Sequence, residues 1–463
     1  MTLVSLDFTN MMTPGLETRG VDPQALDGDL ARAFREAHED VQSRRNSGEM
    51  GFFSLPEARE MARAVQDLAD SFGQWFENIV ILGIGGSALG TITLRDALLG
   101  PYWNELDEEA RDHYPRLYVL DNVDPRGVAG LLDRLDLRRT LFNVVSKSGS
   151  TAETMSQYLV VEERLKRLLG DEAARGHFLF TTDPESGVLR KIADQEGIPT
   201  LEVPPNVGGR FSVLSAVGLL PAAVVGVDIE ELLEGARKMV RKCDTPVLKD
   251  NPAGIVATLL HNADRAHGLP IHVLMPYSDR LRSFAAWFQQ LWAESLGKAR
   301  DREGNVVNRG PTPLPALGAT DQHSLLQLLM EGPRDKVVLF MGVDGVDDPV
   351  EIPRIRQEFS ALSYLGGHSM AELLDTERRA TMEALRQQDR PSLAVEVETL
   401  SPRSLGELFM LFQIATVYAG SLYGVNPLDQ PGVELGKRLT YGLLGREGFE
   451  KPEIGTGGVS WRV

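Results

Sequence analysis

The sequence has 463 residues, 42% of them hydrophobic and 25% charged, so it can bury a large core and should divide into two or three domains. Its formal net charge of -18 argues against nucleic acid and anionic membranes as partners, so any phosphate site must depend on local cations and helix N-termini. The one cysteine, Cys243, excludes a disulfide framework and a multi-cysteine metal site. With no targeting peptide recognisable, a reducing cytoplasm is the expected location.

The first part of the chain predicts a helical arm followed by a strand and a glycine-rich turn. Residues 1–75 have a mostly helical pattern, and the apolar run 79–82 then leads into the turn 83–90. This turn contains G-x-G-x-x-A, which also fits a dinucleotide fingerprint, but the acidic candidate Asp121 lies more than thirty residues from the glycines instead of about twenty. The other interpretation is a tight turn whose glycines only allow close packing of helix on strand.

A second connection from strand to helix, at 141–154, is rich in hydroxyl groups. The apolar run that ends at Val145 predicts a buried parallel strand, and Ser150 and Glu153 have the spacing of a capping box. Free backbone N–H groups at such a helix start, beside several hydroxyls and the ammonium of Lys147, would suit a phosphomonoester. The alternative is a turn whose serines bond only to their own backbone.

Strands that alternate with helices as far as residue 203 predict a doubly wound parallel sheet, with ligands at the carboxyl ends of the strands. Two of those ends, near Ser87 and Ser146, carry the small and hydroxyl residues that a phosphosugar would need. Farther on, Arg210 is a lone guanidinium just before an apolar helix. Such a permanent cation must find an anion, which is either a protein carboxylate or a ligand.

The second half of the chain starts a new α/β pattern and contains two candidate catalytic side chains. Glu294 falls at the edge of an apolar helical stripe, where it is either a solvated helix end or a proton acceptor. His323 lies near the start of another helix. Four histidines without such a setting are interpreted as structural: His261, His267, His272 and His368.

The last third is expected to contain a peripheral insert and a long apolar helix. Residues 350–400 predict the insert, with a helix near 371–387 and an alternating strand at 393–397. The uncharged stretch 408–428 is about long enough to span a bilayer. Its polar residues and the helix end expected near Gly424 favour a helix buried in the protein core.

Six ordered motifs make the chain resemble the glucose-6-phosphate isomerase (phosphoglucose isomerase) family over roughly residues 52–443. The motifs are GIGGS at 83–87, SKSGST at 146–151, GGRFS at 208–212, ESLGK at 294–298, QH at 322–323 and DQPGVELGK at 429–437. The sequence departs from the family pattern at Ser150, often threonine, at Leu428, usually aromatic, and at Asp321, glycine in several members. None of these changes removes a group that the chemistry needs.

The resemblance implies two α/β/α sandwich domains of the SIS type with mainly parallel sheets, plus helical arms at both ends. The implied parts are a helical arm (1–75), a larger first domain (76–245), a second domain with the insert and C-terminal helices (246–443) and a tail (444–463). It implies reversible interconversion of glucose 6-phosphate and fructose 6-phosphate, in glycolysis and gluconeogenesis, without a metal or redox cofactor. It also implies a cytoplasmic homodimer in which the histidine matching His323 enters the neighbouring subunit's active site.

The resemblance also assigns roles to residues of this sequence. Glu294 would move a proton between C2 and C1 through a cis-enediolate whose charge Arg210 stabilises. His323 and Lys437 would open the sugar ring, and Gln430 would help to place the sugar chain. The residues expected to hold or assist the substrate phosphate are Ser146, Lys147, Ser148, Thr151, Thr154, Gly86 and Ser87.

Two other functions fit parts of the sequence. One is a related isomerase that also acts on mannose 6-phosphate or on an amino sugar; a glucosamine synthase is disfavoured because its glutaminase half needs an N-terminal cysteine and position 2 is Thr2. The other is a phosphosugar-binding regulator, which would keep the phosphate loop without the catalytic groups. The candidate catalytic residues, the acidic charge and the lack of a helix-turn-helix signature argue against the regulator.

Overall fold

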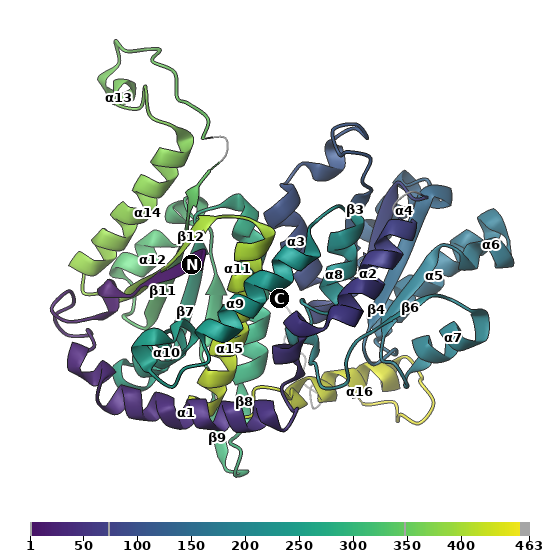
Figure 1. The fold of residues 1–463 in the computed structure, drawn as a ribbon, viewed down its shortest axis with the longest axis horizontal. Helices are drawn as coiled ribbons and strands as arrows, with labels where there is room; N and C mark the ends of the chain where they lie inside the picture. The colour runs from purple at the N-terminus through teal and green to yellow at the C-terminus, as the bar shows by residue number, and fades with distance from the viewer. Residues whose placement is uncertain (1, 73–74, 347–348, 454–463) are drawn as a thin grey trace.

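The computed structural model describes residues 2–72, 75–346 and 349–453, which form two five-stranded sheets side by side with helices packed around them (Figure 1). Alternate side chains of a strand point to opposite faces, and here they enter different cores. Ile79 and Ile81 face a central core that both sheets share, whereas Val80 and Leu82 face an outer core. Since the second sheet divides in the same way, the two expected α/β/α sandwiches are confirmed.

The first sheet is parallel throughout, in the order β3-β2-β4-β5-β6. Its strands are β2 (Asn78–Leu82), β3 (Arg116–Leu120), β4 (Thr140–Ser146), β5 (Phe178–Thr182) and β6 (Thr200–Glu202). The three middle strands are buried along their whole length, which explains their continuous apolar runs. Because the chain passes outward from β2 to β3 and then returns to β4, a topological switch point lies between the carboxyl ends of β2 and β4.

The second sheet has the order β1-β12-β11-β7-β10 and is parallel except for the edge strand β1. Its strands are β1 (Val4–Asp7), β7 (Ile271–Pro276), β10 (Thr312–Pro315), β11 (Lys336–Gly345) and β12 (Ser392–Thr399). The N-terminal arm, expected to be mostly helical, therefore begins with a strand of the second domain. This strand is only four residues long, too short for its alternation to be recognised in the sequence.

The prediction of a peripheral insert at 350–400 is wrong for the second half of this range. β12 lies between β1 and β11 inside the sheet, and the helix before it, α14 (Met370–Gln387), packs on the outer core. Glu396, whose charge gave the strand its half-exposed pattern, is paired with the buried Arg378 at 2.7 Å. The segment 349–369, with the short helix α13 (Ser360–Ser363), does project from the body, as expected of an insert (Figure 1).

The remaining helices cover the two sheets and join them. Those of the first domain are α3 (Leu89–Leu99), α4 (Pro125–Arg134), α5 (Ala152–Leu169), α6 (Asp171–Arg175), α7 (Val188–Glu196) and α8 (Ala216–Val224). The others are α1 (Asp29–Asn46), α2 (Arg59–Phe72), α9 (Ile229–Lys242), α10 (Pro252–His267), α11 (Arg282–Leu296), α12 (Leu326–Glu331), α15 (Pro402–Tyr423) and α16 (Glu434–Leu443). A small hairpin pairs β8 (Lys298–Arg300) with β9 (Val306–Arg309).

The domain boundaries proposed from the sequence stay a prediction, because the central core is continuous between the two sheets.

The long apolar helix is α15, which ends at Gly424 as expected. In the described part of the chain it is the one helix long and apolar enough to cross a membrane, but 89% of its most apolar window is buried inside the protein. It crosses α9 closely, since a Cβ at Gly406 would lie 1.9 Å from the carbonyl oxygen of Leu232. The prediction of a core helix is confirmed.

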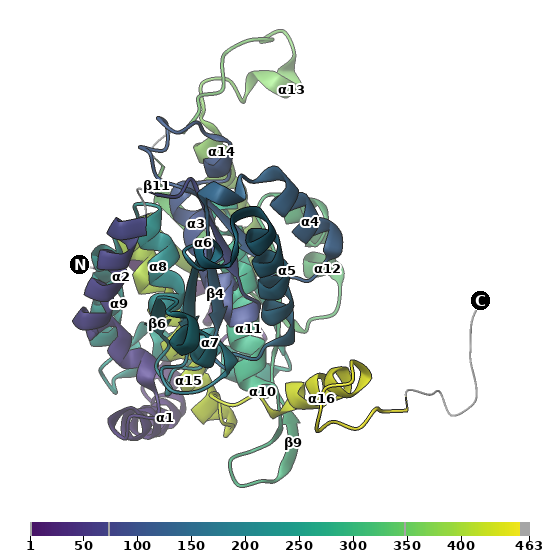
Figure 2. The ribbon, with the colours of Figure 1, turned by 90° about the vertical axis from the view of Figure 1, so that its right-hand side faces the viewer.

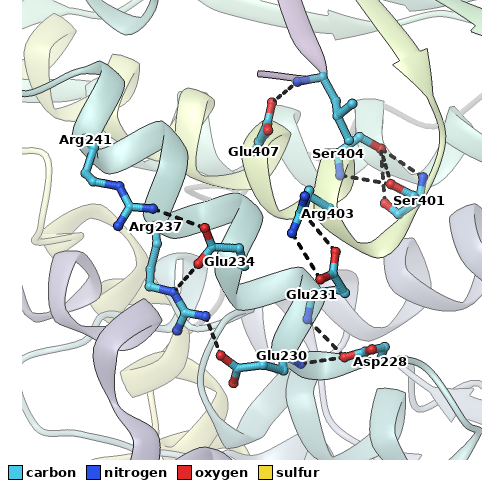
Figure 3. A network of polar contacts seen from close by, with 11 residues as sticks. Asp228, Glu230, Glu231, Glu234, Arg237, Arg241, Ser401, Arg403, Ser404 and Glu407 are labelled. Atoms are coloured by element: carbon cyan, nitrogen blue, oxygen red, sulfur yellow. Dashed lines mark hydrogen bonds and ion pairs between the residues drawn. The ribbon is translucent and has the colours of Figure 1, made fainter. Parts of the chain in front are cut away.

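A polar network ties the start of α15 to its neighbours (Figure 3). Ser401 and Ser404 cap the helix reciprocally, and Arg403 pairs with Glu231 of α9 at 2.9 Å. One turn farther along, the buried carboxylate of Glu407 accepts hydrogen bonds from the backbone N–H groups of Leu3 and Val4, at 2.8 and 3.0 Å. The first strand of the chain is thereby anchored to one of its last helices.

The C-terminal helix α16 stands apart from this packed body (Figure 2). Leu435, Leu439 and Leu443 recur at every fourth position, as on one face of a helix, and are 66%, 38% and 44% exposed. The expected tail 444–463 continues beyond this helix, and its last ten residues lie outside the described residues.

Candidate active site

Beside the switch point of the first sheet, two glycine loops are in direct contact. The turn after β2 contains a short 3-10 helix, Gly85–Ser87, and the loop that carries Arg210 contains another, Gly209–Phe211. A Cβ at Gly86 would lie 2.3 Å from the carbonyl carbon and oxygen of Gly209, so only glycine permits this approach of the two backbones. The glycines of the GIGGS motif therefore fix the position of the Arg210 loop.

Arg210 is the centre of the site, 4% exposed and bonded to two other segments of the chain. Its Nε donates to Oγ of Ser295 at 2.7 Å, and its Nη1 contacts Oε1 of Glu294 at 3.2 Å. The other donations go to the loop after α15: Nη1 to Oε1 of Gln430 at 2.9 Å, and Nη2 to the backbone carbonyls of Pro427 and Asp429 at 2.5 and 3.0 Å. Burial lowers the pKa of Arg210, and the carboxylates of Glu294 and Asp429 oppose this shift.

Glu294 lies in the last turn of α11 with its carboxylate beside this guanidinium. Oε1 faces Arg210, and Oε2 accepts a hydrogen bond from Nε2 of Gln290, one turn earlier, at 3.1 Å. The side chain is 26% exposed, so the carboxylate is held by protein contacts and still reaches the opening of the site. A carboxylate that is fixed, partly solvated and adjacent to a permanent cation can move a proton while the cation stabilises an anion.

The hydroxyl loop after β4 leads into α5 without a side-chain cap. The N-cap residue is Thr151, and its hydroxyl lies 3.0 Å from Oγ of Ser146 and 3.4 Å from Oγ of Ser148 instead of bonding to the helix backbone. Thr154 is 1% exposed, and its Oγ1 has no hydrogen-bond partner among the described residues. The free N–H groups and the clustered hydroxyls form an arrangement suited to an anion.

Two predictions about this loop need correction or completion. The capping box of Ser150 and Glu153 is wrong: α5 begins one residue later, and among the described residues Oγ of Ser150 contacts only Oγ of Ser148, at 3.5 Å. Lys147 turns toward the neighbouring loop, where Nζ donates to the carbonyls of Pro205 and Val207 at 2.7 and 2.8 Å. Burial lowers the pKa of the Lys147 ammonium. Its hydrogen bonds hold the loop 204–209 against the hydroxyl loop.

The structure does not bring His323 and Lys437 to this cluster. His323 is exposed at the end of a 3-10 helix, Thr320–His323, and makes no hydrogen bond to Glu294 or Arg210 within the described chain. Lys437 is exposed on α16, where its Nζ pairs with Oε1 of Glu434 at 2.8 Å. The residues that meet are Arg210, Glu294 and Gln430, while the hydroxyl and glycine loops occupy adjacent strand ends.

Sequence reasoning missed three side chains of this site. Ser295 and Lys298 belong to the ESLGK motif, but nothing in the sequence indicated that Ser295 would receive the guanidinium of Arg210. Gln290 is one helical turn from Glu294, a spacing that predicts contact on a helix surface and could have been noticed. The backbone acceptors at Pro427 and Asp429 have no sequence signal, since every residue carries a carbonyl.

Comparisons with known proteins identify the family of this chain. Residues 55–447 match the Phosphoglucose isomerase family. Among relatives, a glucose-6-phosphate isomerase of Carboxydothermus hydrogenoformans is 43% identical over 97% of this chain and 96% of its own, and one of Rubrobacter xylanophilus is 46% identical over 86% and 90%.

Solved structures show the same architecture. A hypothetical protein from Thermus thermophilus is 40% identical, with a TM-score of 0.85 and coverage of 96% of this chain and 100% of that one. A glucose-6-phosphate isomerase from Chlamydia trachomatis, 24% identical, has a TM-score of 0.81 and coverage of 96% and 88%, and shows the fold alone. Fold and site together define a two-domain α/β protein of the phosphosugar-isomerase type. Within that class, the chain belongs to the phosphoglucose isomerase family.

Proposed function

We propose that this protein is an aldose–ketose isomerase that interconverts glucose 6-phosphate and fructose 6-phosphate. The observation that carries the proposal is the pair formed by Glu294 and Arg210, 3.2 Å apart, at the same edge of the first sheet as the uncapped start of α5. Isomerisation needs a base for the C2 proton, a cation for the enediolate and a seat for the phosphate. The described site supplies one group or cluster for each need.

In the proposed mechanism, Glu294 removes the proton from C2 and returns it to C1. Gln290 keeps the carboxylate oriented through its bond to Oε2. Arg210 stabilises the negative charge that develops on the oxygens, because it is held rigidly by five hydrogen bonds and needs no reorganisation. Gln430, bonded to the same guanidinium, places the sugar chain.

The phosphate is proposed to lie on the hydroxyl loop. The residues proposed to bind it directly or through the backbone are Ser146, Ser148, Thr151, Thr154, Gly86 and Ser87. Lys147 contributes indirectly, since its ammonium is engaged by the carbonyls of Pro205 and Val207. The unpartnered hydroxyl of Thr154 supports the proposal, because a buried polar atom costs stability unless a ligand or water satisfies it.

Ring opening is assigned to His323 and Lys437, and His323 is proposed to act in the neighbouring subunit of a homodimer. Its exposure, and the lack of any hydrogen bond to Glu294 or Arg210 in the described chain, support a contribution in trans. Two-fold symmetry then gives two identical sites, each built from both chains. The single thiol favours a cytoplasmic enzyme, and the proposed reaction is one of glycolysis and gluconeogenesis.

A substrate assay tests the function. The purified protein is offered glucose 6-phosphate, fructose 6-phosphate and mannose 6-phosphate separately, and the products are followed by NMR in D2O. We expect interconversion of the first two with deuterium incorporation at C1 or C2, since the proton passes through an exchangeable carboxylate. Conversion of mannose 6-phosphate as well would define the broader isomerase, and binding without turnover would define a regulator.

A further inference from the structure

Lys298 is a buried cation next to the backbone of the proposed base, Glu294. In the described structure it has no hydrogen bond to the residues assigned to the phosphate. It is 7% exposed and follows Gly297 at the end of α11. Its Nζ donates to the backbone carbonyls of Glu294 and Ser295 at 2.7 and 2.9 Å. Those carbonyls belong to the last turn of the helix, where orphan acceptors and the negative end of the helix dipole favour a cation.

The same ammonium reaches the loop that carries Gln430. Its Nζ lies 3.6 Å from Oδ1 of Asp429, whose own carbonyl accepts the hydrogen bond from Nη2 of Arg210. Lys298 therefore joins the backbone of the base to the segment that receives the guanidinium. If this link were lost, the hydrogen bonds of Arg210 would still join α11 to the loop, with one connection fewer to fix their relative position.

We infer that Lys298 is a positioning residue for the isomerisation: as a cation it fixes the carboxylate of Glu294 and the side chain of Gln430 relative to Arg210. This inference rests on the proposed function. The requirement is geometric, because a base displaced by about 1 Å loses roughly 100-fold in rate although it is chemically intact.

The link from α11 to Asp429 depends on the charge of Lys298, because a neutral amine keeps two N–H donors for the carbonyls of Glu294 and Ser295 but no longer attracts the carboxylate. Burial, and then the neighbouring Arg210, lower its pKa to about 8, while the carboxylates of Asp429 and Glu294 oppose the shift. A cavity of about 700 Å³ borders the ammonium and gives solvent protons access. The other charged groups that line this cavity are Arg44, Glu49, Arg300, Asp301 and Arg302. Because the protonated form is the one that positions the base, kcat/KM should fall as the pH rises through about 8.

The test compares pH profiles of native enzyme, Lys298→Met and Asp429→Asn, with direct detection of product. We expect Lys298→Met to lower kcat by roughly 10- to 100-fold with a change in KM below about 3-fold. In this variant kcat/KM should no longer fall at alkaline pH. Asp429→Asn removes a carboxylate that raises the pKa of Lys298, so its fall should move to lower pH. Asp429 is half exposed, so this variant stays informative even where Lys298→Met does not fold.

The matched control is Lys336→Met. The side chain of Lys336 is about as buried as that of Lys298 and is ion-paired with Asp335, but it lies at the amino end of β11, in the second sheet. It should leave kcat and the pH profile unchanged. The inference is overturned by a native profile that stays flat to pH 9.5, by an alkaline fall that persists in Lys298→Met, or by an unmoved fall in Asp429→Asn. Absence of isomerisation in the native protein would instead refute the proposed function.

Discussion

The hydroxyl of Thr151 faces the hydroxyl of Ser146 at 3.0 Å, although Thr151 occupies the N-cap of α5 and could have capped it. A threonine that caps a helix stabilises it by about 1 kcal/mol. Here that contribution is given up, and the backbone N–H groups at the helix start remain available. The loop is thus arranged for a ligand at some cost to the helix.

The double variant Ser148→Ala and Thr151→Ala tests this interpretation. Both ground and transition states lose the same phosphate contacts, so KM and the inhibition constants of other sugar phosphates should rise by roughly 10- to 100-fold with little change in kcat. Steady-state kinetics and thermal melting measure the two effects. The matched control is Ser150→Ala, because the Ser150 hydroxyl contacts only that of Ser148 among the described residues. A loss of stability without a change in KM would favour a structural turn.

Glu294→Gln keeps the shape of the base and removes its proton transfer. We expect kcat to fall by roughly 10²–10⁴ while a sugar-phosphate inhibitor still binds, because the phosphate loop is untouched. Deuterium incorporation from solvent at C1 and C2 should fall in parallel. Turnover near the native rate would refute the assignment of Glu294 as the base.

Mixed dimers test whether His323 acts in trans. His323→Ala and Glu294→Gln chains should each be nearly inactive alone, but a mixed dimer would contain one site with both lesions and one with neither. With random exchange, about a quarter of all sites should recover. A tagged partner that co-purifies shows that exchange has occurred. Exchange without recovered activity would place His323 in the site of its own chain and leave the isomerase proposal intact.

Glu407 predicts a pH dependence of stability. Burial raises the pKa of this carboxyl above its ordinary value of 4.5, while the N–H groups of Leu3 and Val4 oppose the shift. Because its folded-state pKa is raised, Glu407 stabilises the fold in its protonated form. This contribution is fully present below the unfolded-state pKa and is lost as the pH rises through the folded-state pKa. The uncharged Glu407→Gln avoids this loss, so its free energy of unfolding relative to native protein should increase from pH 4.5 to 8.

Urea denaturation of the native protein and the variant, at several pH values in that range, measures this difference. Glu407→Ala serves as the control, because it removes the acceptors of β1 and should destabilise the protein at every pH. A difference between native protein and Glu407→Gln that does not vary with pH would contradict the prediction.

Much of the fold follows from local sequence because its middle strands and its helices are long and strongly patterned. β4 and α15 were predictable, since continuous burial requires continuous apolar runs. β1 was not, because its partner β12 is remote in sequence and a four-residue strand carries little pattern. The alternation at 393–397 gave no sign that β12 lies inside the sheet, because the partner of Glu396, Arg378, belongs to another element.

The site was predictable in its residue types and less so in its connections. Arg210 was expected to meet a carboxylate or a ligand, and the structure shows that it meets Glu294, a side chain 84 positions away. Three of its five hydrogen bonds go to Gln430 and to backbone carbonyls near it, which no residue type reveals. His323 and Lys437 lie outside the cluster in the folded chain, both exposed, and their roles in ring opening stay predictions.

The anchoring of β1 also sets an order of events during synthesis. Leu3 is made 404 positions before Glu407, so at ordinary rates of translation the strand waits roughly 20–80 s for the helix that holds it. Its pairing partner β12 is made just before Glu407, so the strand waits for both. In a chain that has lost residues 2–7, β12 would be an open edge with unpaired backbone groups and the apolar residues Leu393, Val395 and Val397. The short N-terminal strand, by pairing with β12, therefore prevents this strand from pairing with other chains.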